Sequence, residues 1–145
     1  MIKIRIKPNM EGNNSGANVI LVKNGKILLL LRSKKCRWKP DTYGPPGGHV
    51  DPGETPIQAA VRETHEESGL FVKAADLKPL LQRSKNDFGM VYFYITDKFT
   101  GGGVGITLSN EHYGFAWVGM DKIDNYNTTF EPHELAVIKK ALLSY

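Results

Sequence analysis

The strongest local constraint on this chain is the Asn24-Gly25 pair, which separates two apolar runs at residues 17–22 and 26–31. Two-residue turns between antiparallel strands need positive φ angles at both central positions, and Asn-Gly meets that need at low energetic cost. The pattern therefore predicts a β-hairpin built from these two runs.

A helix is predicted to begin after Thr55 and to stop at Gly69. Thr55 can cap the first turn, Pro56 suits the first helical position, and Gln58 completes a Thr-x-x-Gln capping box. A stripe of small and β-branched residues recurs at helical spacing: Ile57, Ala60, Val61 and Thr64. This stripe is suited to close packing on a sheet.

The remaining pattern indicates a mixed α/β domain. Strands are predicted near residues 77–82, 90–95 and 115–118, and an amphipathic helix around residues 133–143. A length of 145 residues suits one domain, so residues 1–145 are expected to fold together.

Several features favour a cytoplasmic location. Residues 1–7 alternate apolar and basic side chains as a strand does, and lack the continuous apolar core of a secretion signal. The longest aliphatic run, residues 27–31, has five residues, whereas a bilayer span needs about 20. The single cysteine, Cys36, can form no internal disulfide. No membrane helix is expected.

Residues 32–47 contain three prolines and are expected to form an extended loop leading into Gly47-Gly48. Five basic residues lie at the start of this loop, in a chain of net charge +4: Arg32, Lys34, Lys35, Arg37 and Lys39. This cluster favours an anionic partner, and a solvated basic surface is the alternative interpretation.

Three glutamates stand at i, i+3 and i+4 near the end of the predicted helix: Glu63, Glu66 and Glu67. Their carboxylates are expected to cluster on one face, away from the apolar stripe. The negative end of a helix disfavours additional carboxylates, so a compensating positive charge is expected there. Carboxylate oxygens are ligands for hard divalent cations. The pattern favours a magnesium or manganese site, with a solvated acidic face as the alternative.

The wider spacing is more specific than the three glutamates alone. Gly48 is followed by five residues, Glu54, seven residues, and then Arg62-Glu-Thr-His-Glu-Glu-Ser-Gly-Leu. This resembles the Nudix box, G-x5-E-x7-R-E-U-x-E-E-x-G-U, where U is a bulky aliphatic residue. Every fixed Gly, Glu and Arg is matched over 23 residues. Thr64 departs from the pattern, because the family usually has an aliphatic residue there.

The resemblance implies the Nudix fold, an α/β fold with a mixed β-sheet sandwiched between α-helices. It also implies a Mg²⁺ site, in which Mn²⁺ can substitute for Mg²⁺. The implied ligands are Glu63, Glu66 and Glu67, the backbone carbonyl of Gly47, and Glu54 in a supporting position.

The resemblance also implies catalytic roles. Arg62 would orient Glu63 through a charge-assisted hydrogen bond. Glu111 corresponds to a glutamate in a late loop that ligates metal or acts as a base in some relatives, and an ordinary surface glutamate is the alternative. Glu63, Glu67 and Glu111 are all candidates for the general base, and the sequence leaves that choice open.

The activity implied is hydrolysis of a nucleoside diphosphate linked to another group X. The leading expectation is a nucleoside triphosphate pyrophosphohydrolase that releases a nucleoside monophosphate and pyrophosphate. The alternatives are ADP-ribose, nucleotide sugars, dinucleoside polyphosphates and RNA 5′ ends as substrates, and a catalytically silent nucleotide- or RNA-binding module.

The five basic residues at the start of the loop at 32–47 are expected to bind the substrate. Arg32 and Arg37 are the candidates for the outer phosphates, and Trp38 is the candidate for stacking on a base, with a structural tryptophan as the alternative. The alternating residues 2–6 could pair with a second copy, so a homodimer is a further open alternative.

Overall fold

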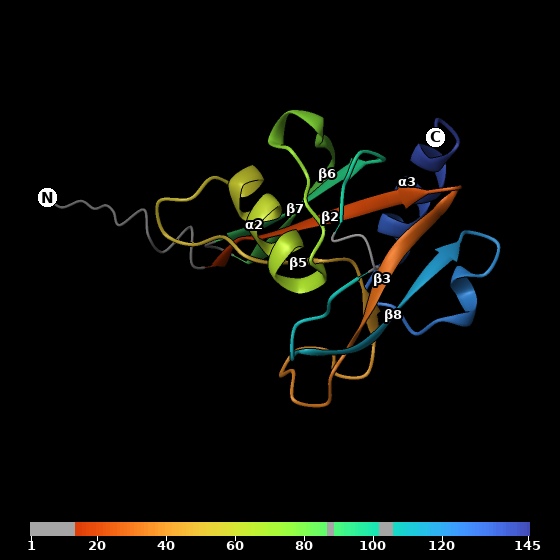
Figure 1. Ribbon diagram of the computed structural model, residues 1–145, viewed down its shortest axis with the longest axis horizontal. Coiled ribbons are helices and arrows are strands. Elements are labelled where there is room, and N and C mark those ends of the chain that lie inside the picture. The colour runs from red at the N-terminus through yellow and green to blue at the C-terminus, as the bar shows by residue number, and fades with distance from the viewer. Residues whose placement is uncertain (1–13, 87–88, 102–105) are drawn as a thin grey trace, which may run out of the picture.

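The computed structural model describes residues 14–86, 89–101 and 106–145 (Figure 1). Its strands and helices are, in chain order, β2 (Gly16–Lys23), β3 (Lys26–Arg32), β4 (Tyr43–Gly44), β5 (Gly47–His49), α2 (Pro56–Ser68), β6 (Lys78–Asn86), β7 (Gly89–Thr96), β8 (His112–Gly119) and α3 (Pro132–Leu142). The strands and helix predicted after residue 76 are confirmed as β6, β7, β8 and α3. The strand predicted over residues 1–7 lies outside the described residues.

The predicted hairpin is formed by β2 and β3. Asn24 and Gly25 both have positive φ angles, 53° and 76°. The two strands pair antiparallel, with Lys23 opposite Lys26 directly beside the turn. The hairpin is confirmed at the expected position.

In the described part of the chain, seven strands form one mixed sheet around this hairpin. β2 lies between β5, which is antiparallel to it, and β7, which is parallel to it. β6 pairs antiparallel with β7, and β3 pairs antiparallel with β4 and with β8. Figure 1 shows the hairpin strands diverging, so that β8 continues the sheet beside β3 and β7 continues it beside β2.

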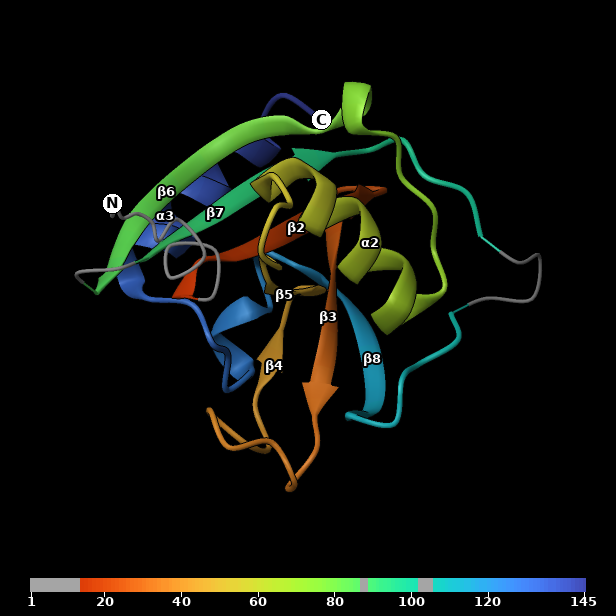
Figure 2. The same ribbon diagram turned by 90° about the vertical axis from the view of Figure 1, so that its left-hand side faces the viewer.

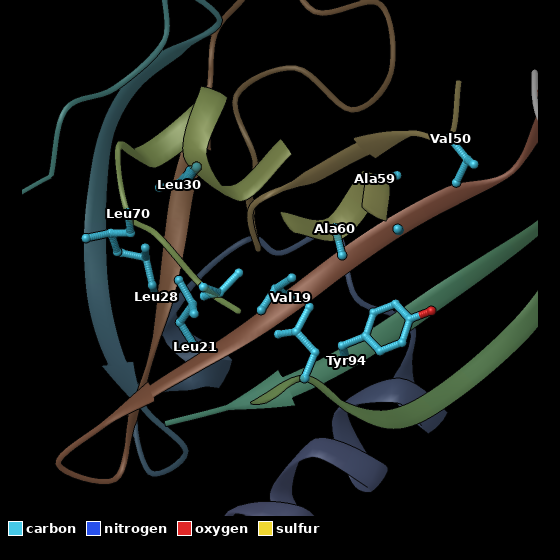
Figure 3. Packing of buried hydrophobic residues seen from close by; sticks show 12 residues of the cluster. Val19, Leu21, Leu28, Leu30, Val50, Ala59, Ala60, Leu70 and Tyr94 are labelled. Carbon is cyan, nitrogen blue, oxygen red and sulfur yellow. The ribbon is translucent and has the colours of Figure 1, made fainter. Parts of the chain in front are cut away.

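Helices α2 and α3 cover opposite faces of the sheet (Figure 2). Alternate residues of β2 therefore enter different cores: Val19 and Leu21 pack on the α2 side, and Ile20 and Val22 pack on the α3 side. Figure 3 shows the α2-side cluster, where Ala60 lies over β2. Strands buried on both faces have continuous apolar sequences, as the two hairpin strands do. None of the described helices has the length and apolar composition needed to cross a bilayer.

The ends of α2 follow the predicted capping signals. Thr55 Oγ1 accepts the N–H of Gln58 at 3.2 Å, and Gln58 Oε1 accepts the N–H of Thr55 at 2.9 Å. Gly69 adopts a left-handed conformation with φ 76°, and its N–H donates to the carbonyl of His65 at 2.8 Å. The capping box and the glycine stop are both confirmed.

The face of α2 that packs on the sheet is wider than the predicted stripe. Ala60 and Thr64 are fully buried, as expected, and Glu67 and Ser68 are buried with them. The expectation that all three glutamates lie away from the apolar stripe is therefore wrong for Glu67. Glu67 follows Ala60 by seven residues, which is close to two helical turns, so the two residues share one face.

The segment at residues 32–47 is more ordered than the predicted loop. It contains β4 and leads into β5, and each of these strands depends on distant partners. Tyr43 N–H donates to the carbonyl of Asn127 at 2.9 Å, and the Tyr43 carbonyl accepts the N–H of Thr129 at 2.8 Å. Strands of two or three residues carry too little periodicity to be recognised in a sequence.

Helix α3 is held to β6 by an ion pair whose carboxylate is buried. Glu134 is fully buried, and its Oε2 accepts a hydrogen bond from Arg83 Nε at 2.5 Å. The other oxygen of Glu134 accepts the N–H of Glu131 at 3.0 Å, which caps the helix. This pair lies on the α3 face of the sheet, opposite to α2.

Candidate active site

Strand β5 brings a glycine pair against the last turns of α2. The N–H of Gly47 donates to Glu67 Oε1 at 2.8 Å. A Cβ atom added to Gly48 would lie 2.5 Å from the carboxyl carbon of Glu63. The absence of a side chain at Gly48 lets the backbone approach the Glu63 carboxylate closely, and at Gly47 it lets β5 lie against Ala17 and Asn18 of β2.

Glu67 is the most deeply buried of these acids, with 7% of its surface exposed. Burial raises the pKa of Glu67 to about 8, against the opposing effect of the hydrogen bond from Gly47. The charges of Glu63 and Glu111 raise this pKa further, and that of Arg32 lowers it. A buried carboxyl group surrounded by other carboxylates has a strong electrostatic preference for a nearby cation.

Arg62 is anchored at the start of the site by Glu54. Its Nε donates to Glu54 Oε2 at 2.8 Å and its Nη2 donates to Glu54 Oε1 at 2.9 Å. This bidentate pair lowers the pKa of Glu54 and raises that of Arg62. Arg62 Nη2 also donates to the carbonyl of His49 at 3.0 Å, and it lies 3.4 Å from Asp51 Oδ2.

The remaining nitrogen of the Arg62 guanidinium, Nη1, forms hydrogen bonds with two glutamates of α2. Arg62 Nη1 donates to Glu63 Oε1 at 2.8 Å and to Glu66 Oε1 at 3.1 Å. The pKa of Glu63 is nevertheless raised, because burial outweighs the hydrogen bond from Arg62. Arg62 thus fixes the positions of the two carboxylates without neutralising the whole acidic group.

Glu111 reaches this group from the turn before β8. Its charge raises the pKa of both Glu63 and Glu67, so the turn lies close to the end of α2. The N–H of Ser109, in the same turn, donates to the main-chain oxygen of Glu67 at 3.3 Å. The structure therefore brings Glu111 to the acids of the box although more than 40 residues separate them in sequence.

The residues 32–39, called here the basic loop, border the acidic group. Arg32 is the residue of this loop whose charge acts on Glu67. Its Nε donates to the carbonyl of Trp38 at 3.0 Å, and its guanidinium lies 5.2 Å from the centre of the Trp38 ring. Lys39 Nζ lies 4.9 Å from the same ring. Trp38 is 51% exposed, and Arg37 is exposed beside it.

The donor set of this site suits a hard divalent cation. Glu63, Glu66 and Glu67 supply carboxylate oxygens, and Gly47 adds a backbone carbonyl in the adjacent strand. Among the described residues, no three acidic, histidine or cysteine side chains converge on one point, and Arg62 lies between two of the three acids. Burial is the main cause of the raised pKa values of Glu63 and Glu67, and the charges of neighbouring acids add to it, so a bound cation would stabilise the ionised forms of both groups.

The sequence of this chain matches a known protein family. The family model described as the NUDIX domain matches residues 12–140. The chain therefore belongs to the Nudix family. Hydrolases of this family act on nucleotides and generally need a divalent metal such as Mg²⁺.

The relatives that are similar to this chain include tetraphosphatases and mRNA hydrolases. The asymmetrical bis(5′-nucleosyl)-tetraphosphatase of Caenorhabditis elegans is 32% identical over 110 residues, which are 70% of this chain and 77% of that protein. The rat protein of the same name is 34% identical over 84 residues, which are 55% of this chain and 57% of the rat protein. The m7GpppN-mRNA hydrolase NUDT17 of Xenopus laevis is 49% identical over 47 residues, which are 32% of this chain and 16% of that protein.

The fold is also found among solved structures. The MutT NUDIX hydrolase from Burkholderia pseudomallei superposes with a TM-score of 0.70 at 22% identity, over 87% of this chain and 95% of the other. This likeness confirms the expected mixed sheet between helices.

Several partners of the acidic group were missed by the sequence analysis. The His49 carbonyl and Asp51 both hold Arg62, and Ser109 ties the Glu111 turn to α2. The N–H of Asp51 donates to Glu54 Oε1 at 3.0 Å. An aspartate three residues before Glu54 is typical of a turn, so this position could have been recognised in the sequence. The Ser109 contact carries no such signal, because it joins elements distant in the chain.

Proposed function

We propose that this chain hydrolyses bis(5′-nucleosyl) tetraphosphates asymmetrically, into a nucleoside triphosphate and a nucleoside monophosphate, in a Mg²⁺-dependent reaction. The observation that carries the proposal is that the turn at Glu111 is hydrogen-bonded both to the end of α2, which carries the acids, and to the basic loop, so that the charge of Arg32 acts on Glu67. A long polyphosphate needs a cation at the reacting phosphorus and basic groups along its outer phosphates. The similarity to asymmetrical tetraphosphatases supports this choice of substrate.

Glu63, Glu66 and Glu67 would hold the cation, with the carbonyl of Gly47 as a further ligand. Glu54 supports the site through Arg62, since both of its oxygens accept hydrogen bonds from that guanidinium. When bound, Mg²⁺, or Mn²⁺ in its place, neutralises phosphate charge and lowers the pKa of the attacking water.

Glu111 is the residue we assign to proton transfer. The water oxygen forms a bond to phosphorus, the bridging P–O bond breaks with its electron pair leaving on the departing phosphate, and the water proton passes to the Glu111 carboxylate. The other candidates are less available for this role. Glu67 is buried and accepts the N–H of Gly47, and Glu63 is held by Arg62.

The basic loop is suited to the phosphates that do not react. Arg32 and Arg37 offer guanidinium groups for bidentate contacts with phosphate oxygens. The exposed ring of Trp38 offers a face for stacking on a base. Arg32 and Lys39 lie over this ring and would bring positive charge to the adjoining phosphates.

The second candidate is the reaction expected from the sequence, the conversion of a nucleoside triphosphate to a monophosphate and pyrophosphate. The same acids serve it, because both reactions break a phosphoanhydride bond. ADP-ribose and nucleotide sugars contain that bond as well. The similarity to an m7GpppN-mRNA hydrolase, over 47 residues, supports RNA 5′ ends as a further class of substrate.

The test compares kcat/KM for diadenosine tetraphosphate, ATP, ADP-ribose and a capped RNA oligonucleotide with Mg²⁺ present, with products separated by anion-exchange chromatography. The proposal predicts the highest value for the tetraphosphate, with ATP and AMP as products. A higher value for ATP, with release of pyrophosphate, would establish the second candidate. Glu66→Gln should lower turnover at least about 10-fold, whereas the exposed Asp124→Asn should match the wild type.

A further inference from the structure

The backbone at Glu111 is fastened to two different parts of the site. Ser109 N–H, two residues earlier, donates to the main-chain oxygen of Glu67 at 3.3 Å. The carbonyl of Glu111 accepts the N–H of Ser33 at 2.9 Å, and the Cys36 thiol donates to the same oxygen at 3.6 Å. The turn that carries Glu111 therefore takes its position from α2 on one side and from the basic loop on the other.

Tyr113 adds a side-chain link between the same two segments. Its hydroxyl accepts the backbone N–H of Lys34 at 2.9 Å, across 79 positions of the sequence. The Tyr113 side chain is 56% exposed, so this hydrogen bond, and not burial, holds the hydroxyl in place. The bond joins the basic loop to β8 two residues beyond Glu111.

The pairing of β3 with β8 is irregular at this point, so the hydrogen bond between Tyr113 and Lys34 lies where the regular strand pairing ends. The register shifts between Leu31, which pairs with Gly114, and Arg32, which pairs with His112, so Tyr113 is the extra residue of a bulge in β8. A bulge ends regular pairing and redirects the strand that contains it. Beyond the bulge, the contacts of Ser33, Lys34 and Cys36 with the Glu111 turn and Tyr113 hold the loop in place of a regular ladder.

We infer that Tyr113 is a positioning residue that keeps the basic loop and Glu111 in a fixed mutual geometry. The inference rests on the proposed function, because it takes the loop as the site of the outer phosphates and Glu111 as the proton acceptor. The phosphate chain held by the loop fixes the reacting phosphorus, and Glu111 has to meet the water on that phosphorus. A displacement of about 1 Å can slow such a reaction about 100-fold.

The kinetic test is a double-mutant cycle on Tyr113 and Glu111. Tyr113→Phe removes the hydroxyl and keeps the ring with its exposed face, so stacking on a base is preserved. We expect kcat for the tetraphosphate to fall about 10-fold, with KM changed less than about twofold. We expect Tyr113→Phe/Glu111→Gln to be no slower than Glu111→Gln alone, because Tyr113 acts through Glu111.

Two kinetic results would overturn the inference. If the two single effects multiply in the double variant, Tyr113 acts independently of Glu111. If Tyr113→Phe changes KM alone, Tyr113 is a substrate-binding residue. Tyr145→Phe is the matched control, because it removes a tyrosine hydroxyl near the C-terminus outside the site, and it should leave both constants at wild-type values.

A second measurement needs no turnover. Inorganic tripolyphosphate is titrated into metal-free protein while the backbone amide of Glu111 is followed by NMR. The Glu111 resonance is expected to shift in the wild type and to shift less than half as far in Tyr113→Phe. Equal shifts in the two proteins, or no shift in the wild type, would contradict the inference. A wild type that hydrolyses no nucleotide would refute the proposed function, and this titration would still decide the role of Tyr113.

Discussion

Glu67 combines two properties that oppose each other in the folded protein. Its position on the buried face of α2 lets it meet the N–H of Gly47, but it also removes a carboxylate from water beside Glu63 and Glu111. The result is a pKa of about 8, which means that ionised Glu67 destabilises the metal-free fold. Bound cation would offset this loss, so function at this residue is gained at the expense of stability.

Glu67→Gln is therefore predicted to stabilise the metal-free protein at high pH. The folded pKa of about 8 exceeds the ordinary value of 4.5, so the stability from the neutral carboxyl is complete below pH 4.5 and lost as the pH rises through 8. Glutamine has no such loss, and the gain at pH 9 should be on the order of 2–4 kcal/mol.

Urea unfolding in EDTA at pH 4 and pH 9 measures this difference, and an equal pH dependence in the two proteins would contradict it. The same variant should lose at least about 100-fold in Mg²⁺-dependent turnover. Gain of stability with loss of activity distinguishes this site from an ordinary buried acid.

Thr64 gives a stability prediction without a catalytic one. Among the described residues its Oγ1 is buried with no hydrogen-bond partner. Thr64→Val has nearly the same shape and removes the unsatisfied hydroxyl, so the free energy of unfolding should rise by about 1–2 kcal/mol. Denaturant unfolding checks the gain, and kcat/KM should be unchanged. A destabilised variant would show that the hydroxyl has a partner after all.

The strands and helices that could be predicted from the sequence are those that local signals determine. The hairpin follows from Asn24-Gly25, and α2 follows from its capping box and Gly69. The burial of Glu67 was also within reach, because its spacing of seven residues from Ala60 places both on one helix face.

The elements that depend on distant partners could not be predicted in the same way. β4 and β5 are too short to show periodicity, and they form because other parts of the chain supply their hydrogen bonds. The approach of Glu111 to α2 joins residues that are more than 40 positions apart in the sequence. The resemblance to the Nudix family, through a late-loop glutamate of some relatives, supplied Glu111 as a candidate, and the contacts of its turn came from the structure.

The attachment of α3 to β6 gives the prediction at this scale. Arg83→Ala would leave the buried carboxylate of Glu134 without its partner, and should lower the free energy of unfolding by about 3–5 kcal/mol. Lys85→Ala, two residues along the same strand and exposed, is the matched control and should change it by less than about 0.5 kcal/mol. Similar losses in both variants, measured by urea unfolding, would show that the ion pair contributes little.

Over the whole molecule, the arrangement of charge matters more than the net value of +4. The acids of α2 lie on one side of the sheet and the exposed lysines of α3 on the other, and the basic loop continues from the end of β3, where the charge of Arg32 acts on Glu67. The loop should therefore attract polyphosphate by a contact that salt weakens.

Raising KCl from 50 to 300 mM is predicted to raise KM for the tetraphosphate several-fold while kcat changes less. Lys34→Gln/Lys35→Gln should flatten this salt dependence, because it removes two charges of the basic loop. Lys139→Gln/Lys140→Gln removes two exposed charges of α3 and should leave the dependence as in the wild type. Equal effects of the two pairs would assign the attraction to net charge and not to the loop.

The central claim is a cation-dependent asymmetric cleavage at the acids of α2, and the most direct test follows the oxygen of the attacking water. Diadenosine tetraphosphate is hydrolysed in ¹⁸O-labelled water with Mg²⁺ or with excess EDTA, and the products are analysed by mass spectrometry. We predict equal amounts of ATP and AMP, one labelled oxygen per turnover, and no hydrolysis in EDTA until Mg²⁺ or Mn²⁺ is restored. Two molecules of ADP as the products, or undiminished hydrolysis in EDTA, would contradict it.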